Sequence, residues 1–166
     1  MILNLKQLVY LYSFIILLNI LGCGNSEKLE DLKVELKRYQ LTVRLDTLSL
    51  ELIIWLQDSW LTGEKESLNR AYKLKSMADK TIDQLIEYQQ KDLKKTELLH
   101  DVKILLKQCL DTGILINKKY RSNVKVHKSK EQGKMNRLMR SLFNHINIMM
   151  RLSSAELKLK TEALEK

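Results

Sequence analysis

A chain of 166 residues without a single proline can form long, unbroken helices, because proline interrupts a helix more strongly than any other residue. Apolar side chains recur three and four positions apart, as at Leu29, Leu32 and Leu36, which is the spacing of one helix face. Sustained apolar–polar alternation and the Asn-Gly or Asp-Gly turns of β-hairpins are missing. The sequence therefore predicts an all-α protein.

Amphipathic segments follow one another along the chain after residue 25. The first is expected to begin at Asn25 or Ser26, either of which can cap a helix, and to end at Thr62-Gly63. Three more are predicted, in chain order, over the ranges 68–86, 98–120 and 134–157. Short links between such segments favour an antiparallel helical bundle over residues 26–166. A bundle of three longer helices, in which the second and third segments are continuous, is the alternative.

Four local features of this pattern predict structural details. Thr96, at the end of the charged break Lys91–Thr96, is expected to cap the third helix. Gly113 lies inside an apolar pattern, which indicates close helix packing rather than a helix end. Residues 121–133 lose the periodicity and are expected to form a loop. The run Leu50–Leu56 is apolar on nearly all sides and is expected to be a central, well-buried stretch.

The tryptophans and one cysteine are interpreted as packing residues. Trp55 falls within the apolar stripe, and Trp60 lies near a helix end, where a core position is favoured over an interface. Cys109 is surrounded by leucines and is expected to be a buried, unreactive thiol. Since Cys23 is the only other cysteine and has a different assignment below, no intrachain disulfide is expected.

The N-terminus has the composition of a secretory signal. Residues 1–22 contain one charge, Lys6, followed by an almost wholly apolar stretch that is short for a membrane-spanning helix. The stretch ends in Ile20-Leu21-Gly22-Cys23, which resembles a bacterial lipobox. The resemblance implies cleavage after Gly22 and lipidation of Cys23, leaving 23–25 as a lipidated tether. An uncut anchor helix is the alternative.

Positive charge is concentrated in residues 118–140. This segment holds nine bases and a single acid, whereas the rest of 23–166 has equal numbers of basic and acidic side chains. The bases are Lys118, Lys119, Arg121, Lys125, Lys128, Lys130, Lys134, Arg137 and Arg140. Such a cluster attracts an anionic partner, which is expected to be a sulfated glycan, a lipid head group or an acidic protein surface. Nucleic acid is the least expected partner, because only Tyr120 interleaves an aromatic ring with these bases.

Part of this charge has a purely structural explanation. Lys118, Lys119 and Arg121 fall at the end of a predicted helix, where the helix dipole favours cations.

No motif for catalysis or metal binding is recognisable. Glu97 and His100 have the spacing of one half of a di-iron site, but the second copy and the additional carboxylates are missing. The sequence contains no HExxH, GxSxG or glycine-rich phosphate loop. We therefore expect a protein that is not an enzyme and that uses no metal or cofactor.

The whole chain resembles the small plasmid- or prophage-encoded surface lipoproteins of borrelial spirochaetes. The resemblance is carried by the lipobox Ile20–Cys23, the proline-free body rich in Lys, Leu, Ile and Asn, and the expected all-helical region. It implies a surface antigen anchored to the cell envelope at the outer membrane. The leading hypothesis is a non-enzymatic binding module that uses residues 118–140. The alternative is a structural or lysis-related envelope lipoprotein of the spanin type.

Overall fold

The computed structural model describes residues 26–89, 92–121 and 130–164, and these residues form four helices. In chain order the helices are α2 (Ser26–Thr62), α3 (Lys65–Tyr88), α4 (Leu93–Arg121) and α5 (Lys130–Leu164). No strand occurs within these three ranges. The all-α prediction is confirmed. Because α3 and α4 are separate helices, the bundle of four helices is correct and the three-helix alternative is not.

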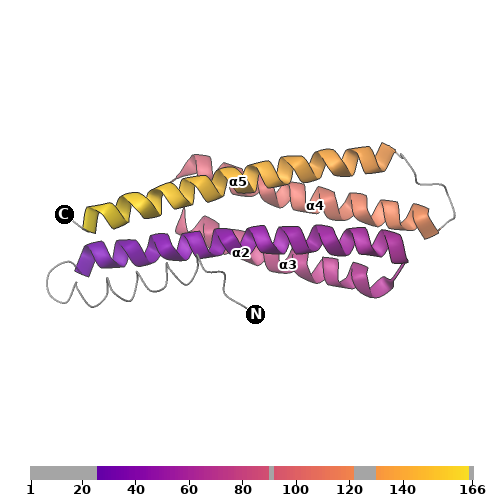
Figure 1. The fold of residues 1–166 in the computed structure, drawn as a ribbon, viewed down its shortest axis with the longest axis horizontal. Helices are drawn as coiled ribbons and strands as arrows, with labels where there is room; N and C mark the ends of the chain where they lie inside the picture. The colour runs from indigo at the N-terminus through magenta and orange to yellow at the C-terminus, as the bar shows by residue number, and fades with distance from the viewer. Residues whose placement is uncertain (1–25, 90–91, 122–129, 165–166) are drawn as a thin grey trace.

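The helices pack as an elongated antiparallel bundle (Figure 1). α2 and α4 each lie beside α3 and α5, and α2 also contacts α4 across the bundle. We call the end where α2 and α4 finish and α3 and α5 begin the distal end. The proximal end is where α2 begins, at Ser26, and α5 finishes, at Leu164. Figure 1 shows that α2 and α5 continue past the ends of α3 and α4, so of the four described helices only these two reach the proximal end.

Apolar side chains from all four helices form one core. Burying a side chain such as leucine contributes about 1.5–3 kcal/mol, so this shared core is what holds the helices together. Its fully buried members include Leu45, Leu52, Leu56, Ile82, Leu85, Leu99, Leu106, Ile116, Met135, Leu142 and Ile146.

The apolar run Leu50–Leu56 is buried on one side only. Leu52 and Leu56 have no exposed surface, but Leu50 is 50% exposed and Ile54 is 51% exposed. The other helices cover only part of the circumference of α2, so the side that carries Leu50 and Ile54 faces solvent. The expectation of a well-buried stretch is therefore wrong for Leu50 and Ile54.

Two glycines have the roles that their positions predict. Gly63 adopts a φ of 69° and its N–H donates to the Ser59 carbonyl at 3.1 Å, so α2 ends where expected. Gly113 lies against Leu56, and a Cβ added at Gly113 would come within 2.7 Å of the Leu56 Cδ2 atom. The prediction of close packing at Gly113 is confirmed.

The start of α4 differs from the prediction. α4 begins at Leu93, and the Asp92 carboxylate accepts a hydrogen bond from the Lys95 N–H at 3.2 Å. Thr96 lies inside the helix and donates to the Asp92 carbonyl at 3.0 Å. The prediction of Thr96 as the cap is therefore wrong, because α4 begins one turn earlier and the Asp92 carboxylate binds a free N–H of its first turn.

The predicted loop 121–133 is too long at both ends. Arg121 belongs to α4, and α5 begins at Lys130 rather than about Lys134. Gly133 lies within the first turns of α5, so one glycine among good helix formers does not delay the helix. The remainder of the loop, residues 122–129, lies outside the described residues.

The aromatic and thiol side chains pack as interpreted. Trp55 and Trp60 are partly buried against the core, and the Arg70 guanidinium lies 4.3 Å from the centre of the Trp55 ring. Cys109 is fully buried, and burial raises the pKa of its thiol to about 12. The prediction of a buried Cys109 is confirmed.

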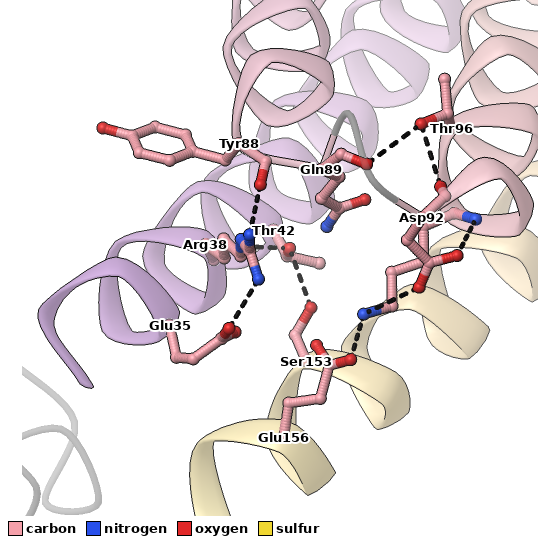
Figure 2. A network of polar contacts seen from close by, with 10 residues as sticks. Glu35, Arg38, Thr42, Tyr88, Gln89, Asp92, Thr96, Ser153 and Glu156 are labelled. Carbon is pink, nitrogen blue, oxygen red and sulfur yellow. Dashed lines mark hydrogen bonds and ion pairs between the residues drawn. The ribbon is translucent and has the colours of Figure 1, made fainter. Parts of the chain in front are cut away.

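Polar side chains from α2 and α5 converge where the bundle narrows, beside the α3–α4 link (Figure 2). Arg38 of α2 donates to the Tyr88 carbonyl at the end of α3 and contacts the Glu35 carboxylate at 2.5 Å. The hydroxyls of Thr42 and Ser153, 3.4 Å apart, join α2 to α5. These contacts fix the level along α2 at which the α3–α4 link packs.

Lys95 adds α4 to this polar network through an ion pair with Glu156 of α5. The network also contains buried atoms without a hydrogen-bond partner: Glu35 Oε2, Arg38 Nε and Gln89 Oε1. Such atoms cost free energy, so the network contributes less to stability than its number of polar contacts suggests.

Candidate functional site

The distal end is held together by hydrogen bonds between the last turns of α2 and α4. The Trp60 indole N–H donates to the Gly113 carbonyl at 2.9 Å, and the Asn117 amide donates to the Ser59 carbonyl at 2.6 Å. Arg121 donates to the Gly63 carbonyl in the α2–α3 turn. The close approach of helices at Gly113 therefore brings the end of α4 directly onto the end of α2.

The last two of these contacts define a register. Ser59 is 58 residues before Asn117, and Gly63 is 58 residues before Arg121. Since α2 and α4 run in the same direction, residues separated by this number lie at the same level. Leu61 is thus level with Lys119, and Thr62 is level with Tyr120.

Two bases of the predicted cluster take part in the packing of the distal end. Arg121 bonds to the α2–α3 turn, as described above. The Lys119 ammonium lies 2.5 Å from the Glu131 carboxylate and so connects α4 to the first turn of α5. Tertiary contacts thus account for Lys119 and Arg121, whereas the favourable effect of the helix dipole on Lys118, Lys119 and Arg121 stays a prediction.

Five other bases of the cluster are exposed and form no ion pair within the described part of the chain. On α5, Lys130, Lys134 and Arg137 are separated by four and three residues, so they share one helix face. That face lies away from Met135 and Leu142, which point into the core. The full set is Lys118, Lys130, Lys134, Arg137 and Arg140.

Acidic side chains are unevenly distributed around this end. No acid occurs on α5 from Gln132 to Ala155, whereas the start of α3 carries Glu66, paired with Arg70 at 2.9 Å. Exposed Glu64 lies in the α2–α3 turn. The positive potential is therefore strongest on the α4–α5 side of the distal end.

Exposed apolar side chains accompany the bases at the distal end. Leu61, in the last turn of α2, is 74% exposed, and Tyr120, in the last turn of α4, is 44% exposed. Sequence reasoning did not select either residue as functional. The sequence feature that could have indicated them is their position, because each is a large apolar residue in the last turn of a helix.

The remaining predicted residues of the cluster and the lipidation site are not placed by the structure. Lys125 and Lys128 lie in 122–129, and Cys23 precedes the first described residue, so all three lie outside the described residues. None of the helices described has both the length and the apolar character needed to span a membrane.

The histidines of the described helices have structural contacts or lie exposed. The His145 Nδ1–H donates to the Ser141 carbonyl at 2.8 Å, and the Nε2 atom lies 3.9 Å from the Asp101 carboxylate. Glu97 and His100 are both exposed on α4. In the ranges that the structure describes, no group of three or more His, Cys, Asp or Glu side chains is arranged to hold a metal ion.

An open hollow on α5 borders the basic face. All six residues that line it belong to α5, so it is a surface depression rather than an enclosed cavity. They are Asn136, Met139, Arg140, Phe143, Asn144 and Asn147.

Comparison of the chain with protein-family models, curated proteins and solved structures finds no match.

Proposed function

We propose that this chain is a lipid-anchored envelope protein whose distal end is a non-enzymatic binding module for an anionic partner. The observation that carries the proposal is the set of exposed bases at that end: Lys118, Lys130, Lys134, Arg137 and Arg140. We call this set the basic platform; Lys118 belongs to the last turn of α4, and the other four bases belong to the first turns of α5. No acid occurs on α5 from Gln132 to Ala155, so the positive potential of these bases is not neutralised by neighbours on that helix and attracts an anionic partner.

The anchor in this proposal is the Cys23 thiol. Gly24-Asn25 is the whole of the chain between Cys23 and the first residue of α2. Each buried CH₂ group of an acyl chain contributes about 0.8 kcal/mol, so two or three chains hold a protein on a membrane without a spanning helix. Mass spectrometry of the chain from bacterial membranes tests this point. A mass equal to that of the unmodified sequence would contradict the anchor.

Charge reversal tests the binding module. Lys130→Glu combined with Lys134→Glu is expected to abolish retention on immobilised heparin at physiological salt, because both charges lie on the exposed face of α5. The matched control is Lys73→Glu combined with Lys80→Glu, which changes two exposed lysines on α3. Circular dichroism should show equal helicity in both variants. Equal retention of both variants would refute the proposal.

A structural role in the envelope is the second candidate, and the exposed face of α2 favours it. Leu50 and Ile54 lie four residues apart on that face, where a second long helix would cover them. Sedimentation of the chain distinguishes this candidate, since an assembly through α2 predicts oligomers that Leu50→Gln with Ile54→Gln dissociates. Protease shaving of intact cells separates display outside the cell, which predicts cleavage, from a periplasm-facing position, which predicts protection.

A further inference from the structure

The two ends of the bundle are far apart. α2 has 37 residues, and at 1.5 Å per residue it is about 55 Å long. The basic platform lies at the end of α2, whereas Ser26 lies at its beginning (Figure 1). Cys23 is three residues before Ser26 and so is within about 11 Å of it along the chain. A lipid on Cys23 therefore holds the end of the bundle that is remote from the basic platform.

The distal end also combines chemical groups that suit a bilayer surface. Leu61 is level with Lys119, and Tyr120 lies between Lys119 and Arg121 in sequence. Leucine and tyrosine side chains partition into the interface of a membrane, while nearby bases bind anionic head groups. Recognition of a soluble polyanion needs the bases but gains little from a leucine that is 74% exposed.

We infer that the distal end docks on an anionic lipid bilayer that faces the anchoring membrane, so that one chain connects two membranes. The inference rests on the proposed function, from which it takes the lipid anchor and the basic platform. The contacting residues are Leu61 and Tyr120 together with the exposed bases of α4 and α5. Each base near an anionic membrane is expected to strengthen binding about fivefold.

Clustering of vesicles tests the inference directly. The full, lipidated chain is inserted into phosphatidylcholine vesicles, which are then mixed with vesicles that contain phosphatidylglycerol. Light scattering should rise as the two populations cluster, and it should stay constant when the second population is also pure phosphatidylcholine. Clustering with neutral vesicles to the same extent would overturn the inference.

Variants separate the apolar contacts from the charges. Leu61→Gln combined with Tyr120→Gln is expected to require about tenfold more chain for the same clustering, because two apolar contacts with the bilayer are lost. Leu93→Gln is the matched control, since Leu93 is 76% exposed but lies at the α3–α4 link. Lys130→Glu with Lys134→Glu should abolish clustering. If the double variant Leu61→Gln with Tyr120→Gln and the control Leu93→Gln change clustering equally, the role of the two apolar residues is overturned.

The outcomes also separate this inference from the proposed function. A chain that binds heparin through the α5 lysines but does not cluster anionic vesicles retains the proposed function and refutes the bilayer as partner. A chain that binds neither probe refutes both. In a last experiment, phosphatidylglycerol is present only in the vesicles that carry the lipidated chain. Protection of Lys130 and Lys134 from amine labelling in that experiment would show docking on the same membrane and would overturn the facing geometry.

Discussion

Gly113→Ala is expected to destabilise the bundle, although alanine is the better helix former. The added Cβ would lie 2.7 Å from Leu56 Cδ2, 3.1 Å from Cδ1 and 3.3 Å from Cγ. Leu56 has no exposed surface, so it cannot move without displacing other core side chains. Overpacking of this kind costs about 1–3 kcal/mol, whereas the gain in helix propensity is about 1 kcal/mol. We expect a net loss of about 1 kcal/mol in the free energy of unfolding.

Gly133→Ala is the matched control for this prediction. Gly133 is also inside a helix, but its nearest potential contact is the flexible end of Arg137 at 4.0 Å. This variant gains helix propensity without a steric cost and is expected to be about 1 kcal/mol more stable. Urea unfolding followed by circular dichroism gives both changes as shifts of the midpoint in opposite directions.

A double-mutant cycle identifies the cause of the loss. Leu56→Ala alone is expected to cost about 2–5 kcal/mol by leaving a cavity. Combined with Gly113→Ala it should cost less than the sum of the single changes, because the new methyl group occupies part of that cavity. Equal midpoint shifts for Gly113→Ala and Gly133→Ala would refute close helix packing at Gly113.

Three further predictions concern titratable groups. Burial raises the pKa of Cys109 to about 12, so a thiol reagent at neutral pH should modify Cys109 only as fast as the bundle opens, and rapid labelling of the folded chain would contradict this. Burial also raises the pKa of Asp46, which disfavours its charged form in the folded state. Asp46→Asn should therefore raise the unfolding midpoint at neutral pH, and the gain should disappear in acid below the unfolded pKa of about 3.9, where Asp46 is protonated in both states. The hydrogen bond from Lys160 lowers the pKa of Asp31. The stabilisation of the fold by ionised Asp31 is therefore present above the unfolded pKa and is lost as the pH falls through the folded pKa. Lys160→Met should remove this part of the acid dependence of the unfolding midpoint.

Helix content and the end of the first helix could be predicted because they depend on local properties. The apolar spacing of α2 and the Thr62-Gly63 stop are present in the sequence itself. Exposure within an apolar run cannot be read in the same way. Leu50 and Leu52 look equivalent in sequence, and only the positions of the neighbouring helices decide that one is half exposed and the other buried.

Capping also depended on a competition that local patterns do not resolve. Asp92 and Thr96 are both able to cap a helix, and both precede apolar residues. The structure places Asp92 directly after α3, where its N–H donates to the Gln89 carbonyl at 2.8 Å, and its carboxylate there accepts from the Lys95 N–H.

The basic cluster was predicted from the sequence, but the different roles of its members were not. Lys119 and Arg121 bond to groups that are 12 and 58 residues away, and such contacts become visible only in the folded bundle. The exposure of Leu61 and Tyr120 is likewise a property of the assembled end. The lipidation of Cys23 and the borrelial resemblance stay predictions, since Cys23 lies outside the described residues.

The extension of α2 and α5 beyond the α3–α4 link has a mechanical consequence. Tension applied between Ser26 and the bases of α5 would enter along α2 and leave along α5, and the two helices contact each other directly. The pull is parallel to their axes, so it shears many side-chain contacts at once instead of separating them one by one. A bundle loaded in this geometry resists extension until a whole row of contacts gives way together, and the hydroxyl contact between Thr42 and Ser153 belongs to that row.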